Sequence, residues 1–201
     1  MKIIFYRHGK TAGNLKGNYI GKTDEPLCPE GIAALHPPQD GKQVKKVYTS
    51  PLLRTVQTAR ILFPGAEIVS HSGLSEMDFG VFEGKNYVEL QNDSAYRAWL
   101  ESGCEDRCPG GESRAEFVNR ICFAFKEIVN RALADEEEEL WFVVHGGTIM
   151  AIFSKFALPS RPYFDWRIEN GEALTAKLEE REWDKTEKFC LCISAEEDYK
   201  K

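Results

Sequence analysis

Short apolar runs alternate along the chain with longer stretches of helical periodicity. Six runs predict strands: Lys2–Tyr6, Lys46–Thr49, Glu67–Val69, Leu140–Val144, Ala173–Leu178 and Lys188–Ser194. Helical spacing covers residues 29–35, 50–63, two short stretches within 80–111, 113–133 and a segment that follows Thr148 and runs through Leu158. Because strands and helices alternate, the pattern predicts an α/β sandwich.

Two helix starts have recognisable capping residues. Ser50 followed by Pro51 predicts an N-cap and a first helical position. Ser113 with Glu116 has the spacing of a capping box at the start of the longest predicted helix. The run from Leu140 to Val144 is continuously apolar, which is typical of a strand buried on both faces of a sheet.

Composition and charge narrow the class of protein. The 201 residues correspond to a single domain, and 26 basic against 32 acidic residues give a net charge of −6. An acidic chain is a poor general binder of nucleic acid or of anionic membranes, so we expect neither as a partner. No apolar run is long enough to span a bilayer, and Ile3–Tyr6 is too short for a signal peptide. We therefore expect a cytoplasmic protein; the oligomeric state is left open.

The six cysteines show no spacing typical of a zinc site. Reduced thiols are the expected state in a cytoplasmic protein. A disulfide or metal clip between Cys104 and Cys108, which are four residues apart, is the alternative.

Basic side chains follow three of the predicted strands. Arg7 and His8 end the first, Arg54 lies just beyond the second, and His145 follows Leu140–Val144. Ligands of open α/β sheets bind at the carboxyl ends of strands, so these groups are expected to meet in one pocket. Two arginines beside helix N-termini favour an anion, and phosphate fits their planar donors best.

One carboxyl group is placed to move protons in such a pocket. Glu76 follows the third predicted strand, and beside a cationic phosphate site it would donate and accept a proton. Asp78 and Glu83 are close by, and Glu83 is interpreted as a structural carboxylate of the turn. His36 and His71 lie outside any motif and are interpreted as structural.

Five segments, in chain order, resemble the signature of the histidine phosphatase superfamily, which includes cofactor-dependent phosphoglycerate mutases. They are Arg7-His8-Gly9-Lys10-Thr11 with Asn14, then residues 19–27, 50–59, 74–84 and 143–147, so the resemblance covers about residues 2–155. It implies one domain over residues 1–201. The implied fold is a three-layer α/β/α sandwich with a mostly parallel, phosphoglycerate mutase-like sheet and a small helical cap inserted at about 84–112.

The resemblance also implies a mechanism without a metal or cofactor. His8 would be the nucleophile that forms a phosphohistidine, and Glu76 the proton donor and acceptor. Arg7, Arg54 and His145 would bind the phosphoryl oxygens. Further substrate contacts are predicted at Thr11, Asn14, Gly21 and Gly146.

Among family members, the resemblance favours a phosphatase acting on a small phosphorylated metabolite. The inserted region lacks the adjacent arginine pair of the mutases. Three segments are similar to α-ribazole phosphatases, whose substrate is α-ribazole 5′-phosphate in cobalamin biosynthesis: Ala95–Trp99, Pro109–Ser113 and Ile168–Gly171. A phosphoglycerate mutase and a catalytically silent phospho-ligand binding module remain alternatives. Tyr87, Tyr96 and Trp99 either stack on an aromatic leaving group or form cap core.

Overall fold

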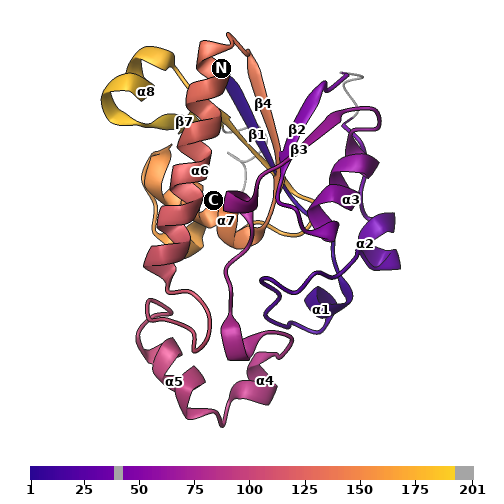
Figure 1. Cartoon of the computed structure of the whole chain (residues 1–201), viewed down its shortest axis with the longest axis vertical. Coiled ribbons are helices and arrows are strands. Elements are labelled where there is room, and N and C mark those ends of the chain that lie inside the picture. The colour runs from indigo at the N-terminus through magenta and orange to yellow at the C-terminus, as the bar shows by residue number, and fades with distance from the viewer. Residues whose placement is uncertain (39–42, 193–201) are drawn as a thin grey trace, which may run out of the picture.

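A mixed sheet runs through the centre of the molecule in the order β3-β2-β4-β1-β6-β7-β5 (Figure 1). The computed structural model describes residues 1–38 and 43–192. The strands are β1 (Lys2–Arg7), β2 (Lys46–Thr49), β3 (Glu67–Ser70), β4 (Glu139–Val144), β5 (Ala157–Leu158), β6 (Ala173–Lys177) and β7 (Phe189–Leu191). Strands β3, β2, β4 and β1 are parallel, and β6 is antiparallel to both β1 and β7.

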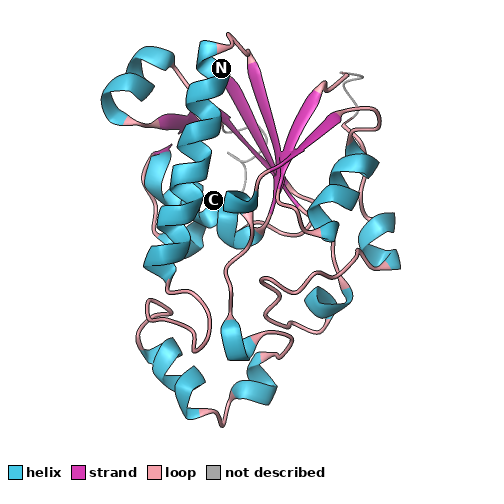
Figure 2. Cartoon of the chain, in the orientation of Figure 1, coloured by secondary structure: helices cyan, strands magenta, loops and turns pink. Residues whose placement is uncertain are grey.

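Helices cover both faces of this sheet (Figure 2). The α-helices are α1 (Ala12–Leu15), α2 (Pro29–Ala33), α3 (Leu53–Leu62), α4 (Tyr87–Leu90), α5 (Ser94–Glu101), α6 (Arg114–Ala134), α7 (Gly146–Phe156) and α8 (Glu180–Thr186). Short 3₁₀ helices are η1 (Ser72–Leu74), η2 (Gly80–Phe82) and η3 (Tyr163–Trp166). None of the helices in the described part of the chain has both the length and the apolar character needed to cross a bilayer.

Alternate residues of the strands pack into two separate hydrophobic cores, one on each face of the sheet. Ile3 and Phe5 of β1 pack with α6 and α7, whereas Ile4 packs with α3 on the opposite face. Strand β4 divides in the same way, with Phe142 on the first face and Val143 on the second. This two-sided burial explains the continuous apolar run of β4 and confirms the predicted three-layer α/β/α sandwich with a mostly parallel sheet.

One helix boundary differs from the sequence prediction because side chains from distant segments contact this end of the helix. Helix α3 begins at Leu53, not at Ser50, and its N-cap Leu52 offers no capping side chain. The Ser50 hydroxyl accepts from the Leu52 amide at 3.3 Å but lies closer, at 2.7 Å, to His145 Nε2, while Asp24 Oδ1 accepts from the Leu53 amide at 2.7 Å. A distant carboxylate therefore caps this helix, and the serine belongs to the site.

Other boundaries shift by a few residues. Helix α7 ends at Phe156, two residues before the predicted Leu158, because Ala157 and Leu158 pair with β7 as an additional strand. The predicted strand 188–194 is realised as Phe189–Leu191, and its positions 193 and 194 lie outside the described residues. The predicted capping box at Ser113 is confirmed at the start of α6.

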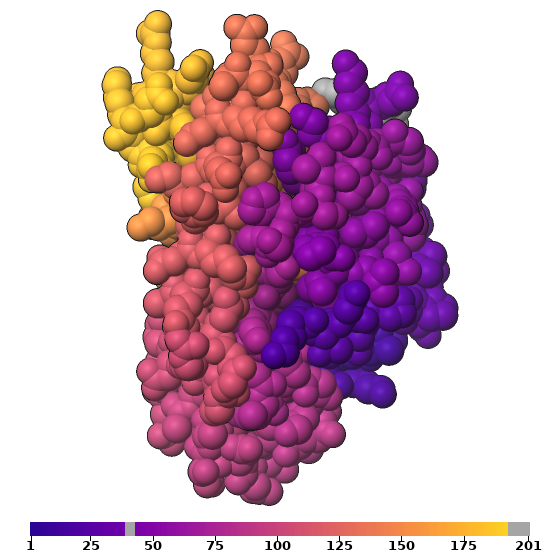
Figure 3. Space-filling view, viewed as in Figure 1, coloured from indigo at the N-terminus to yellow at the C-terminus, as the bar shows by residue number. Residues whose placement is uncertain are grey.

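The segment 84–112 contains α4, α5 and the loop that follows them. It forms one end of the molecule, beyond the carboxyl ends of the strands, and contacts the N-terminal loop region (Figures 1 and 3). The Asn18 side chain donates to the Gly84 carbonyl at 2.8 Å, and the Tyr19 and Tyr96 hydroxyls are 2.8 Å apart. These contacts place 84–112 opposite the strand ends that carry the predicted site.

Candidate active site

The parallel strands bring the predicted basic residues to one edge of the sheet. In the register between β1 and β4, Arg7 lies opposite Val144, so His8 and His145 are neighbours. Their rings are 5.2 Å apart between centroids. The register between β2 and β4 places Thr49 opposite Val143, which brings Ser50 to the same edge.

His8 is buried and held in one neutral form. Its Nδ1 atom is 2.6 Å from the Gly9 carbonyl, which accepts only if Nδ1 carries the proton. Burial, followed by the nearby Arg54 charge, moves the pKa of His8 well below 6.5. The unprotonated Nε2 atom is then available as a nucleophile.

Arg54 is 0% exposed, and its guanidinium is held by backbone carbonyls. Nη1 donates to the Thr23 carbonyl at 2.7 Å, and Nη2 donates to the Gly21 carbonyl at 2.7 Å. Nε donates to His145 Nδ1 at 3.3 Å. Burial lowers the pKa of Arg54, and the Glu76 carboxyl opposes this shift.

His145 is also 0% exposed, and both of its ring nitrogens have partners. Because Nδ1 accepts from Arg54, Nε2 carries the proton and donates to the Ser50 hydroxyl. Burial, and next the charge of Arg54, moves the pKa of His145 well below 6.5. His145 and Arg54 thus lie behind His8 rather than on the cavity surface.

Glu76 is half-buried, and both of its carboxyl oxygens accept from backbone amides. Oε1 accepts from its neighbour Met77 at 2.9 Å, and Oε2 accepts from Gly147, near the start of α7, at 2.9 Å. A Cβ atom at Gly147 would collide with this carboxyl group, so the close approach requires glycine. Burial raises the pKa of Glu76 above 4.5, although the two amides and the Arg54 and Arg7 charges oppose the shift.

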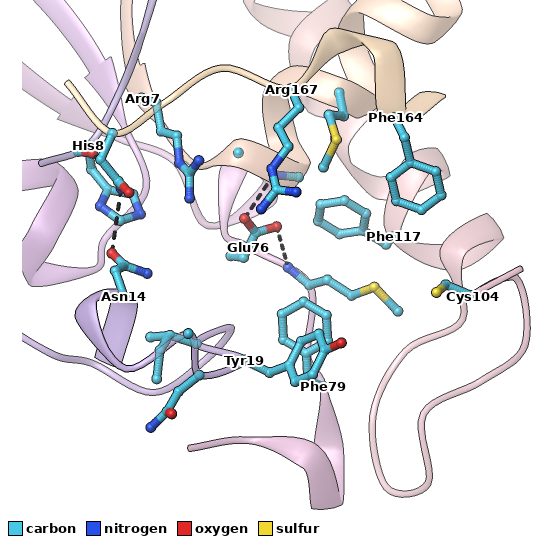
Figure 4. Close-up of a pocket in the computed structure, with 18 of the residues that line it drawn as sticks. Arg7, His8, Asn14, Tyr19, Glu76, Phe79, Cys104, Phe117, Phe164 and Arg167 are labelled. Carbon is cyan, nitrogen blue, oxygen red and sulfur yellow. Dashed lines mark hydrogen bonds between the residues drawn. The ribbon is translucent and has the colours of Figure 1, made fainter. Parts of the chain in front are cut away.

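A cavity of about 580 Å³ opens in front of these groups (Figure 4). Arg7, His8, Asn14, Glu76 and Gly146 lie on its wall, whereas Arg54 and His145, which the sequence predicts for the same pocket, lie outside it. The rest of the wall combines apolar and aromatic side chains with polar and charged ones. The first group includes Tyr19, Ile20, Met77, Phe79, Phe117, Met150, Tyr163 and Phe164, and the second Lys10, Asn18, Arg114, Arg167, Glu169 and Asn170. Convergent polar groups beside an apolar wall are typical of a small-molecule site.

Two predicted substrate contacts have other roles in the structure. Thr11 is 0% exposed, and its hydroxyl accepts from the Asn14 amide at 3.2 Å as the N-cap of α1. The Gly21 amide donates to the Glu83 carboxylate at 3.1 Å, so it is not directed at the cavity. The Thr11 hydroxyl is used within its own turn, whereas the Gly21 amide is bound by a carboxylate 62 residues away in sequence.

The aromatic residues of 84–112 divide between core and surface. Tyr96 is buried among Tyr19, Phe82 and Trp99, as expected for cap core. Trp99 is buried too but also reaches the cavity, and Tyr87 lines the cavity while 68% exposed.

Several residues of the site carry no signal in the sequence. Arg120 donates to the carbonyls of Gly73 and Ser75 and to Glu112, which fixes the segment that carries Glu76. Late in the chain, the Ile168 carbonyl accepts from Arg7 Nη1 at 2.7 Å. Asn170 donates to the His8 carbonyl at 3.0 Å. For these late contacts the sequence signal is the resemblance of Ile168–Gly171 to a segment of α-ribazole phosphatases.

The six cysteines are free thiols in the structure. Burial raises the pKa of Cys108 to about 12, and it also raises the pKa of Cys104. Within residues 1–38 and 43–192, no group of three or more His, Cys, Asp or Glu side chains is arranged to hold a metal ion.

Comparison with known proteins identifies the family. The profile of the histidine phosphatase superfamily (branch 1) matches residues 3–189. The chain belongs to this superfamily. Its membership accounts for the order of the five segments and for the basic groups at the strand ends.

The similar proteins within the superfamily include both phosphatases and a phosphoglycerate mutase. The adenosylcobalamin/alpha-ribazole phosphatase of Salmonella typhimurium is 27% identical over 85% of this chain and 87% of its own length. The crystal structure of the alpha-ribazole phosphatase from Shigella flexneri superposes with a TM-score of 0.75 at 22% identity, covering 96% of this chain and 95% of that one. A phosphoglycerate mutase from Thermus thermophilus gives a TM-score of 0.62 at 26% identity, covering 87% and 92%. These structures confirm the phosphoglycerate mutase-like fold.

Proposed function

We propose that this chain is a metal-independent phosphomonoesterase that works through a phosphohistidine at His8. The observation that carries the proposal is the state of His8. Its proton is held at Nδ1 by the Gly9 carbonyl, its pKa is lowered by burial, and the side chain lines the cavity. A neutral imidazole with a fixed tautomer is what attack on phosphorus requires.

In the first step, His8 Nε2 forms a bond to phosphorus while the bond from phosphorus to the ester oxygen breaks. Glu76, whose pKa is raised by burial, donates a proton to the leaving oxygen. In the second step, Glu76 takes a proton from water, the water oxygen bonds to phosphorus, and His8 is released. Arg7 and Arg54 supply positive charge beside the transferring group.

The aromatic side chains on the cavity wall favour a substrate with a bulky leaving group. Tyr19, Phe79 and Phe164 surround the space beyond Glu76, and Figure 4 shows their rings gathered on that side. Aromatic rings of this kind stack on a flat apolar group. We therefore propose α-ribazole 5′-phosphate as the first substrate to test, with 84–112 as the cap over its leaving group. The name of the Salmonella typhimurium relative supports the same choice.

The decisive experiment uses a chromogenic phosphate ester in the presence of EDTA. We expect turnover by the wild-type protein, none by His8→Ala, and wild-type turnover by His36→Ala, whose side chain is exposed. Acid-labile ³²P labelling should occur in the wild type and not in His8→Ala. Absence of both turnover and labelling in the wild type would favour the silent binding module, and turnover by His8→Ala would refute the role of His8.

A second candidate function is a phosphoglycerate mutase. Arg167 and Lys10 line the cavity, and within the described residues neither forms an ion pair, so they are available to a substrate carboxylate. Figure 4 shows Arg167 directed into the cavity near Arg7 and Glu76. A coupled assay of 3- to 2-phosphoglycerate conversion separates the mutase from the phosphatase.

A further inference from the structure

Glu83 follows η2, and its carboxylate accepts hydrogen bonds from the backbone amides of a loop in a different part of the chain. The backbone amides of Gly21 and Lys22 donate to it at 3.1 Å, and that of Thr23 donates at 3.3 Å. The Thr23 hydroxyl donates at 2.6 Å, and the Phe79 amide adds a further bond at 3.1 Å. Consecutive amides converging on one point form a nest that binds an anion. Here the anion is a side chain of the protein.

The same loop holds Arg54 through its carbonyl groups. Thr23 and Gly21 each accept from the guanidinium at 2.7 Å, and the Ile20 carbonyl accepts at 3.4 Å. Amides and carbonyls of one short loop therefore connect Glu83 on one side with Arg54 on the other. Arg54 in turn donates from Nε to His145 Nδ1.

This arrangement leaves little freedom to the loop. A Cβ atom at Gly21 would collide with the Met77 carbonyl and with Glu83, so the loop packs directly against the turn that carries the carboxylate. Hydrogen bonds to a carboxylate are about twice as strong as those between neutral groups. Without that carboxylate the amides of Gly21, Lys22 and Thr23 would lose their acceptor, and the carbonyls facing Arg54 would move with them.

We propose that Glu83 is a positioning residue for the phosphoryl site, acting through loop 20–23 to set the orientation of Arg54 beside His8. The inference rests on the proposed function, because it concerns the arginine that would stabilise the transferring phosphoryl group. Glu83 itself lies outside the cavity wall.

The test begins with Glu83→Gln, which keeps the size of the side chain but turns an NH2 group toward the donors of the nest. A misplacement of about 1 Å at a catalytic group costs about 100-fold, and we expect a loss of kcat/KM of that order. Lys22→Ala is the matched control. Its side chain pairs with Asp78 from the same loop, while its backbone amide stays on Glu83, so we expect wild-type kinetics.

A double-mutant cycle separates positioning from general stability. In an Arg54→Ala background, Glu83→Gln should lower kcat/KM by less than about threefold, because residues acting as a unit are not additive. The inhibition constant of orthovanadate should rise in Glu83→Gln and stay unchanged in Lys22→Ala. Equal losses in both backgrounds, or a lower melting temperature with an unchanged inhibition constant, would overturn the proposal.

If Glu83→Gln does not fold, Thr23→Val provides the same test. It removes only the 2.6 Å bond from the Thr23 hydroxyl and keeps the charge and the β-branched shape. We expect a smaller loss of kcat/KM that again disappears in the Arg54→Ala background, and an undiminished loss there would contradict the proposal. Lack of turnover by the wild type would instead refute the proposed function.

Discussion

The Nε2 atom of His145 lies 2.7 Å from the hydroxyl oxygen of Ser50, and both residues are 0% exposed. Because Arg54 donates to Nδ1, this hydroxyl is the acceptor that keeps the His145 proton on Nε2. Ser50 comes directly after β2 and His145 directly after β4. The hydrogen bond therefore joins two strand ends as well as fixing a tautomer.

Replacing Ser50 by Ala should destabilise the fold. A buried N–H left without an acceptor costs about 1–3 kcal/mol, so we expect a decrease of that size in the free energy of unfolding, together with reduced kcat. Urea denaturation and steady-state kinetics measure both. Ser154→Ala is the control, since this hydroxyl bonds only within α7, and its effect should stay within about 0.5 kcal/mol. Equal stability of the two variants would contradict the role of Ser50.

Stability should fall as the pH drops below 6.5. His8 and His145 have folded pKa values well below 6.5, so below that pH the unfolded chain binds more protons than the folded one. Each group adds a slope of up to about 1.4 kcal/mol per pH unit. Glu76, whose pKa is raised, contributes with the opposite sign above pH 4.5.

Urea denaturation as a function of pH measures this slope. His8→Asn should reduce it by up to about 1.4 kcal/mol per pH unit. An unchanged slope in His8→Asn would show that His8 does not have a lowered pKa.

The pH dependence of kcat/KM should have an acidic limb from His8 and an alkaline limb from Glu76. The first lies below pH 6.5, where His8 becomes charged, and the second lies above pH 4.5, where Glu76 loses its proton. Glu76→Gln should remove the alkaline limb and lower kcat by about 10²–10⁴-fold.

The choice of leaving group makes this test specific to proton donation. The loss in Glu76→Gln should be larger for an alkyl phosphate than for a nitrophenyl phosphate, because the nitrophenolate needs less help to leave. Glu127→Gln, a change on the outer face of α6, should leave both rates unchanged. An equal loss with both esters would argue against Glu76 as the general acid.

Phe164 should contribute to binding of aromatic leaving groups. It is 53% exposed and lines the cavity, so it can be shortened without opening the core. Loss of its partly buried ring should cost about 1 kcal/mol, or about fivefold in KM, for an aryl ester. The KM of a small alkyl ester should not change. Phe123→Ala, which removes a 72% exposed ring on α6 outside this cavity, is the control. Equal effects on both esters would contradict a leaving-group role.

The sequence predicts the sheet well because its signals are local. The apolar run at β4 and the capping box of α6 depend only on neighbouring residues, and both are confirmed. The meeting of His8 and His145 also follows from sequence, since parallel strands end at one edge.

Pairwise side-chain contacts are less predictable, because they depend on distant segments. Ser50 resembles an N-cap locally, yet His145, 95 residues away, binds its hydroxyl. Gly21 resembles a phosphate ligand, yet Glu83 already accepts from its amide. In both cases the competing partner comes from elsewhere in the fold, and nothing in the local pattern identifies it.

The hydrogen bonds from Arg7 to Ile168 and from Asn170 to His8 span 161 and 162 residues. Arg7 and His8 are thus supported by a segment that is translated much later. An N-terminal fragment that stops before Ile168 lacks this support, even if it contains all the other residues of the site. During synthesis on the ribosome, Arg7 and His8 would therefore lack these two hydrogen bonds until residue 170 had emerged.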